Sequence, residues 1–292
     1  MKKLLLMLLT MLLLCAAVAA EIHLIEDESQ LPEGWTEKEL FRLTALDTDR
    51  SDALLLQCGG ENMMIDGGYV SYYNRLEEWF DDHGITEFKY LYNTHPDSDH
   101  IHGLSKMMNS GKYEIGSFLS AVKQNYTGTS FHKTAMQVLK KQGIPYVQIF
   151  DGDVLTLGGA TLTVVRCDEP WGVNNRSAAC HVRFGNSTMF LSGDCGNDPL
   201  KYFIANRDHA LLECDIMKAQ HHGINGIVDE FFAVAQPEFV FVPNAKANLT
   251  EDKQKHFEKK GAWFNGDGPI IMETDGTDWY IWQLPNWEPK AE

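Results

Sequence analysis

Apolar and polar residues alternate along several short segments of the chain, with turns rich in glycine or asparagine between many of them. Such alternation is typical of β-strands that bury one face. The pattern predicts strands over residues 40–47, 53–57, 62–65, 154–157, 160–166, 178–184 and 188–192. An apolar, aromatic run over residues 88–92 predicts a further, buried strand.

Helical periodicity appears between and after these strands. Residues 71–83 place Leu76, Trp79 and Phe80 on one face before Gly84 ends the segment. Similar patterns predict helices over residues 131–142, 198–206 and 250–260. Groups of strands separated by helices favour a layered α/β fold with helices outside the sheets.

The first twenty residues have the composition of a secretory signal peptide. Lys2 and Lys3 precede an apolar stretch over residues 4–15, and small residues follow over 16–20. We expect cleavage near Ala19 or Ala20 and a secreted protein. Lipid attachment at Cys15 is disfavoured because Leu14 is bulkier than such a motif prefers.

Residues 21–292 show no linker, repeat or low-complexity tract, which favours a single domain. They also contain no apolar segment of the length that a membrane span needs. Loss of Lys2 and Lys3 with the signal peptide would take the formal charge from −16 to −18. An acidic surface repels polyanions, so extended nucleic acid is disfavoured as a partner and a small molecule or small phosphodiester remains open.

Five cysteines follow the predicted signal peptide. Their number is odd and no CxxC spacing occurs, so buried free thiols are favoured, although an exported protein permits one disulfide. The five are Cys58, Cys167, Cys180, Cys195 and Cys214.

The densest chemistry lies in residues 94–103, directly after the predicted strand at 88–92. His95, Asp97, Asp99 and His100 are four potential metal ligands within six positions. In an extended loop, residues two apart face the same way, so His95 and Asp97 can converge on one ion. Imidazole and carboxylate ligands suit Zn²⁺, Mn²⁺ or Fe. The segment predicts a site for two divalent ions, which would activate a water molecule for hydrolysis.

Further candidate ligands occur later in the chain. Asp194 follows the strand predicted at 188–192, although a turn aspartate is the plain alternative. His221 and His222 form a pair of which one is expected to bind metal, with His221 slightly favoured. Asp66, before two glycines, is interpreted as a supporting carboxylate rather than a ligand.

Taken in order, these motifs resemble the metallo-β-lactamase superfamily. Within it they are similar to the branch that includes the hydrolase domain of the bacterial competence DNA-uptake channel protein. The resemblance covers roughly residues 42–283 and rests on Asp66, the 95–100 loop, Leu191-Ser192-Gly193-Asp194, Asn174-Asn175-Arg176-Ser177 and Met217-Lys218-Ala219-Gln220-His221-His222-Gly223.

The resemblance implies a four-layer αββα sandwich with a dinuclear metal centre at one edge of the sheets. By position, His95 and Asp97 would bind one ion, and Asp99 and His100 the other. Asp194 would bridge both ions, and the histidine pair would complete the site.

Three segments depart from the family pattern. Asn174 to Ser177 stands where many members have a metal-binding histidine, and Asn244 to Asn248 replaces an expected His-Pro segment. The family's Gln-Gly-Asp is here Arg50-Ser51-Asp52. These departures leave reduced or altered activity open.

The resulting functional hypothesis is a secreted, metal-dependent hydrolase, with a phosphodiester as the favoured substrate. Asp99 or Asp194 would position the attacking water, and His222 or Lys218 would protonate or stabilise the leaving oxygen. Two alternatives stay open. One is hydrolysis of a non-phosphate ester, lactone or thioester, and the other is a binding protein that kept the fold without catalysis.

Overall fold

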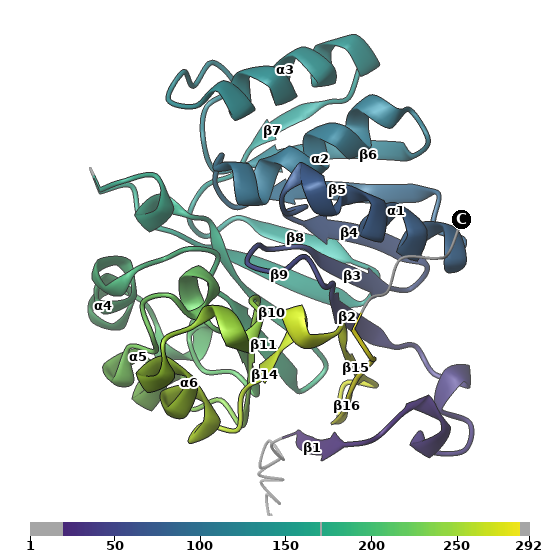
Figure 1. The fold of residues 1–292 in the computed structure, drawn as a ribbon, viewed down its shortest axis with the longest axis vertical. Helices are drawn as coiled ribbons and strands as arrows, with labels where there is room; N and C mark the ends of the chain where they lie inside the picture. Colours follow the sequence, from purple (N-terminus) through teal and green to yellow (C-terminus); the bar gives the residue numbers. More distant parts are fainter. Residues whose placement is uncertain (1–19, 170, 287–292) are drawn as a thin grey trace, which may run out of the picture.

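The computed structural model describes residues 20–169 and 171–286, and the predicted signal peptide at residues 1–20 falls outside this part except for Ala20. Two mixed β-sheets lie face to face (Figure 1). The larger sheet has the strand order β1 (Glu21–Leu24), β16 (Asp278–Gln283), β15 (Ile270–Thr274), β2 (Phe41–Ala45), β3 (Leu54–Cys58), β4 (Glu61–Ile65), β5 (Glu87–Asn93), β6 (Glu114–Ser120) and β7 (Tyr146–Gln148). The smaller sheet has the order β14 (Trp263–Phe264), β13 (Phe239–Val242), β12 (Ile216–Lys218), β11 (Ser187–Leu191), β10 (Ala179–Phe184), β9 (Ala160–Val165) and β8 (Val154–Leu157).

Helices cover the outer face of each sheet. The larger sheet carries α1 (Tyr73–Asp82), α2 (Ser98–Ser110) and α3 (Ser130–Gln142), and the smaller sheet carries α4 (Asn197–Asn206), α5 (Asp229–Ala235) and α6 (Glu251–Glu258) (Figure 1). The order helix, sheet, sheet, helix confirms the predicted αββα sandwich. None of the helices in the described ranges combines the length and the apolar character of a bilayer span.

Strand β3 shows how the sequence builds these layers. Leu54 and Leu56 point into the core between the sheets, whereas Leu55 packs under the helices of the larger sheet. Successive side chains in a strand alternate between faces, and both faces of this sheet are covered. An uninterrupted apolar run is therefore what a central strand of this sandwich requires.

Strand direction brings several loops to one edge of the sandwich. Strands β4 and β5 run parallel, as do β11 and β12, so each pair delivers its carboxyl-terminal loops to the same end. Strands β3 and β10 run antiparallel to β4 and β11, so the residues before them reach this end too. Residues far apart in sequence therefore meet at this edge of the two sheets.

Candidate metal centre

The loop between β5 and α2 carries His95, Asp97, Asp99 and His100. Helix α2 begins at Ser98 with Asp97 in the N-cap position, so Asp99 and His100 lie in its first turn. Backbone N–H groups of His100 and Ile101 donate to the Asp97 carbonyl. The rigid start of a helix thus fixes the positions of the later two side chains.

A contact between two glycines seats α2 against the larger sheet. The N–H of Gly67 donates to the carbonyl of His100 at 2.8 Å, and the N–H of Gly103 donates to that of Gly68 at 2.9 Å. A Cβ atom at Gly103 would lie 1.8 Å from the carbonyl oxygen of Gly67. Only glycine permits this approach, which places His100 beside the end of β4.

Asp194 lies at the middle of the centre. Its Oδ2 is 3.1 Å from Nε2 of His100, 3.3 Å from that of His222, and 3.7 Å from those of His95 and His221. The structure therefore brings together all four histidines that the sequence singled out, around one carboxylate oxygen.

Asp97 and Asp99 complete this group from opposite sides. Asp97 Oδ2 lies 3.7 Å from Nε2 of His95, and Asp99 Oδ2 lies 3.4 Å from Nε2 of His222. The side chains of Asp97, His221 and Asp99 are 32%, 27% and 20% exposed, whereas that of Asp194 is buried. The centre thus opens to solvent along the side that these three residues form.

Buried carboxylates hold two of the imidazoles from behind. Asp66 Oδ2 lies 2.7 Å from Nδ1 of His100, and Asp52 Oδ1 lies 3.2 Å from Nδ1 of His222. Asp66 also accepts hydrogen bonds from Asn93, from the Thr94 amide and from its hydroxyl. The geometry matches the predicted supporting place of Asp66, and such partners fix the ring orientation of metal-binding histidines.

The sequence did not predict that Asp52 contacts a histidine of the centre, and it placed Lys218 at the leaving oxygen rather than in the interior. Lys218 is buried, and its Nζ lies 2.9 Å from Asp52 Oδ2 while donating to the carbonyls of Gly193 and Ala219. It therefore faces the interior behind the histidines, away from the exposed side where a leaving group would lie. The Asp of Arg50-Ser51-Asp52 was the one sequence signal for this role.

Two of the segments that depart from the family pattern, residues 174–177 and 244–248, contact the histidines of the centre. Ser177 Oγ lies 3.2 Å from Nδ1 of His95, and Asn174 Nδ2 lies 3.5 Å from Nε2 of His221. Asn244 donates through Nδ2 to the carbonyl of His222 at 2.9 Å. Asn174 and Ser177 thus contact imidazoles of the centre, and Asn244 holds the backbone of His222.

The backbone of the centre is held in an uncommon conformation. Asp66, His221 and His222 have positive φ angles of 55°, 46° and 52°. Non-glycine residues rarely adopt positive φ, and such residues gather at functional sites where surrounding contacts hold them.

Electrostatics favour ionised carboxylate at the middle of the centre. Burial alone would raise the pKa of Asp194, but His100 and His222 outweigh burial and hold that pKa well below its ordinary range. Burial and the nearby His100 lower the pKa of His95 to about 3. A neutral imidazole and an anionic carboxylate are the states in which these groups bind metal.

Buried polar atoms of the centre are left without hydrogen-bond partners. Within the described ranges, Nε2 of His95, His100 and His222 and Oδ1 of Asp194 have none. Buried polar groups are otherwise nearly always satisfied. One ligand atom each from Asp52, His100, Asp194 and His222 lie within 4.8 Å of one another. This donor set fits divalent metal ions.

The cysteines take no part in this cluster. All five described cysteines are buried free thiols, including Cys195 next to Asp194. Burial and the Asp194 carboxylate raise the pKa of Cys195 to about 12, which disfavours the thiolate that metal binding requires.

Comparison with known proteins identifies the family. Residues 46–227 match the Metallo-beta-lactamase superfamily. Because the match spans more than half of the chain, the chain belongs to this superfamily. No curated protein matches the chain in sequence.

A solved structure agrees with this assignment of the fold. The chain is similar to the metallo-beta-lactamase fold protein YhfI from Bacillus subtilis, with 10% identity, a TM-score of 0.50 and coverage of 77% of this chain and 95% of that one. It is also similar to CmlA, a diiron beta-hydroxylase from Streptomyces venezuelae, with 14% identity, a TM-score of 0.49 and coverage of 77% of this chain. The chain spans about half of CmlA, with 53% of that chain covered.

Proposed function

We propose that this chain is an exported, metal-dependent hydrolase that cleaves phosphodiester bonds with two divalent ions. The observation that carries the proposal is the position of Asp194 Oδ2, within 3.7 Å of the Nε2 atoms of four histidines. Burying several polar groups together without hydrogen-bond or metal partners costs folding free energy. A cluster of this kind is therefore best explained by cations that bind the nitrogen and carboxylate atoms together.

The contacts divide the ligands into two sets. Asp97 lies beside His95, and Asp99 lies beside His222. The buried position of His222 favours it as a ligand in addition to His221, which the sequence had slightly preferred. In this proposal His95, Asp97 and His221 would hold one ion and Asp99, His100 and His222 the other, with Asp194 close to both sets.

When bound, two adjacent divalent ions lower the pKa of water and stabilise negative charge on the oxygens of the substrate. Asp97 and Asp99 are the carboxylates on the exposed side, so they are placed to orient the attacking water. Lys218 stabilises the interior of the site through Asp52. Protonation of the leaving oxygen by His222, which the sequence suggested, is not part of this assignment because it places His222 among the metal ligands.

The charge of the centre supports a phosphodiester as substrate. Three carboxylates, those of Asp97, Asp99 and Asp194, set against two divalent ions leave about one positive charge, which suits a singly charged ester. The predicted resemblance of the loop at residues 95–100 to that of the competence-protein branch is consistent with cleavage of a phosphodiester bond. The donor set suits Zn²⁺ first, with Mn²⁺ or Fe as alternatives.

Export is part of the proposal and rests on the composition of residues 1–20. The test is N-terminal sequencing of the protein recovered outside the producing cell. A first residue near 20 or 21 would support cleavage of a signal peptide, and retention of Met1 in a cell-associated protein would contradict it.

Hydrolysis of bis(4-nitrophenyl) phosphate by the purified chain tests the reaction, with metal counted in the same sample. We expect about two metal ions per chain, as in two-metal hydrolases. EDTA should abolish activity, Zn²⁺ or Mn²⁺ should restore it, and Asp99→Asn should remove it. Lys259→Gln, an exposed change at the end of α6, is the matched control and should retain activity.

Other outcomes separate the alternatives. Two bound ions without turnover would contradict the phosphodiester and direct the search to esters, lactones or thioesters. Neither metal nor turnover would contradict the hydrolase and leave a binding protein with a hydrolase fold.

A further inference from the structure

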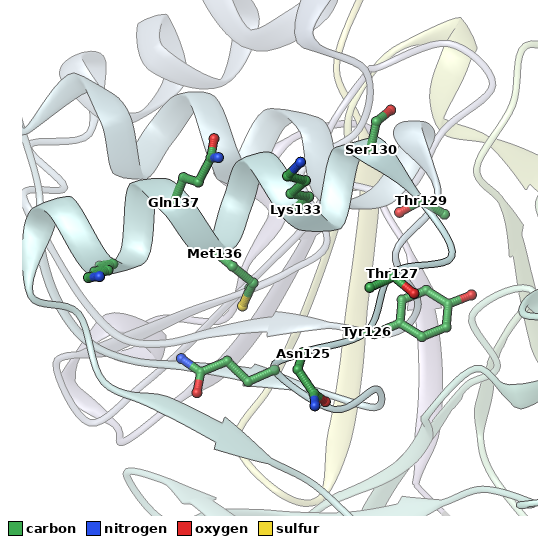
Figure 2. Close-up of a pocket in the computed structure, with 10 residues that line it drawn as sticks. Asn125, Tyr126, Thr127, Thr129, Ser130, Lys133, Met136 and Gln137 are labelled. Carbon is green, nitrogen blue, oxygen red and sulfur yellow. The ribbon is translucent and has the colours of Figure 1, made fainter.

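Two cavities share Asn125 and Tyr126 in their walls. The larger, of about 640 Å³, lies between the 124–129 loop and helix α3. Figure 2 shows Met136 of α3 pointing toward the segment that carries Asn125. The smaller, of about 210 Å³, reaches from Lys123 to Arg176. Because they share these two walls, the two cavities together are called the side groove below.

One face of α3 forms a wall of the side groove. Lys133, Met136 and Gln137 (Figure 2), together with Lys140, recur at helical spacing and line the larger cavity. Two lysines on this face give the wall positive charge, and Met136 gives it an apolar strip. Such a wall suits an organic group that carries negative charge.

The charge of the smaller cavity is opposite to that of the chain. Lys123, Arg166 and Arg176 line it against Asp168 alone, whereas the chain as a whole carries −16. Arg166 is committed to its own contacts, since its Nη2 lies 2.6 Å from Asp168 and its Nη1 donates to two backbone carbonyls. Lys123 and Arg176 are thus the cations that this cavity offers to a ligand.

In sequence, Arg176 lies between two residues that contact histidines of the metal centre. Its neighbours Asn174 and Ser177 contact His221 and His95 at 3.5 and 3.2 Å. The Nε of Arg176 is buried and lacks a hydrogen-bond partner within the described part of the chain. Because this nitrogen has no protein partner, the Arg176 side chain, which lines the smaller cavity, keeps donor capacity for a ligand.

A hydrogen bond joins the wall of the side groove to the loop that carries His95 and Asp97. Thr129, at the wall of the larger cavity, donates through its hydroxyl to the carbonyl of Pro96 at 3.0 Å. Pro96 stands between His95 and Asp97. The wall of the larger cavity is therefore joined by one hydrogen bond to the loop that carries His95 and Asp97.

We propose that Arg176 and Lys123 form an anion subsite for a second phosphate of the substrate. The substrate class is then a small phosphodiester that carries a further phosphate group, with its organic part against Tyr126 and α3. Guanidinium groups bind phosphate oxygens in a paired geometry, which makes Arg176 the main contact. This inference rests on the proposed phosphodiesterase function.

A matched pair of substrates tests the subsite. Thymidine 5′-(4-nitrophenyl phosphate) and its 3′-phosphorylated form share the cleaved bond and differ in the second phosphate. We expect kcat/KM to favour the phosphorylated form by about tenfold or more, as for a hydrogen bond to a charged group. Arg176→Gln should reduce this ratio by about tenfold, and Lys123→Gln by less. The Lys259→Gln control should keep it.

The ratio is taken within each variant, so a change in metal content cancels. A parent protein without preference, or an Arg176→Gln variant that keeps the full preference, would overturn the subsite. Because the contact is electrostatic, higher salt should weaken the preference.

A binding measurement separates failure of the subsite from failure of the proposed function. Thymidine 3′,5′-bisphosphate is titrated calorimetrically into the chain in EDTA, where no turnover occurs. Binding that weakens about tenfold in Arg176→Gln supports the subsite even if no phosphodiester is cleaved. Equal binding by the parent and Arg176→Gln would overturn the subsite even if cleavage is found.

Discussion

Two histidines of the metal centre are held in place by buried carboxylates. Asp66 fixes Nδ1 of His100, and Asp52 fixes Nδ1 of His222, so each ring directs Nε2 toward Asp194. Asp52 differs because it also neutralises the buried Lys218. Its removal would disturb both a histidine and a buried cation.

Substitution of Asp52 tests this coupling. Asp52→Asn leaves Lys218 buried without a counter-charge, so we expect the free energy of unfolding to fall by about 3 kcal/mol. Adding Lys218→Met removes the second charge, and the double variant should be more stable than the sum of the two single losses predicts. Urea denaturation in EDTA measures all three variants, and strictly additive losses would contradict the coupling.

A buried histidine outside the centre predicts a dependence of stability on pH. His181 in β10 is buried, and its Nε2 lies 3.1 Å from the carbonyl oxygen of Glu213. Burial lowers the pKa of His181 to about 4. The unfolded chain therefore binds this proton first, so stability falls as pH drops from about 6.5 to 4.

His181→Gln should remove that contribution, which is roughly 3 kcal/mol across the whole interval. The difference in unfolding free energy between parent and variant is measured by urea denaturation at several pH values. We expect this difference to shift in favour of the variant as pH falls. A constant difference between pH 7 and 4 would show that His181 does not titrate in this way.

At the scale of elements, α2 is the part whose placement matters most. Its first turn carries Asp99 and His100, and its contact with the larger sheet is made by Gly67 and Gly103 without side chains between them. A shift of this helix would move two of the proposed ligands together.

Gly103→Ala is expected to displace α2 because a Cβ atom there would overlap the Gly67 carbonyl. We expect a loss of about 3 kcal/mol or more in unfolding free energy, together with weaker Zn²⁺ binding by calorimetry. Gly111→Ala, at the other end of the helix, is the control. It meets no atom within 4 Å and incurs only the strain of positive φ, about 1 kcal/mol. Equal zinc affinity in both variants would contradict the role of the glycine contact.

How well each strand was predicted depended on how its side chains are buried. Strands with clear alternation or turn signals, such as β8, β9 and β10, were expected within one or two residues of their bounds. Strands β13 and β15 were not assigned. Every residue of both is buried, so neither shows the alternation that marks a strand: β13 is fully apolar, and β15 is three apolar residues followed by Glu273 and Thr274.

Across the whole molecule, the centre joins the two sheets. His95 and His100 come from the loop and helix after β5 in the larger sheet, while Asp194, His221 and His222 follow β11 and β12 in the smaller one. Ions bound there would link the two halves of the sandwich at one edge. Metal binding and the stability of the whole fold are therefore coupled.

Zn²⁺ should raise the unfolding temperature, and EDTA should reverse the change. Binding to the folded state alone stabilises it by about 2.7 kcal/mol at ~100 times the dissociation constant. In Asp194→Asn the shift should largely vanish, because the central carboxylate contacts all four histidines. Scanning fluorimetry with and without Zn²⁺ measures the shift. A shift of the same size in the variant would place the bound ion elsewhere.

The sequence by itself determined the fold class and the kinds of ligand. The strand and helix patterns favoured a layered α/β fold, and the spacing of His95, Asp97, Asp99 and His100 reflects short-range geometry that a loop leading into a helix preserves. Only the tertiary structure decided which distant groups face these ligands. Asp52, Ser177 and Lys218 reach the centre because strand order and direction bring their loops to one edge. Strand order depends on packing between distant segments, which local sequence patterns do not encode.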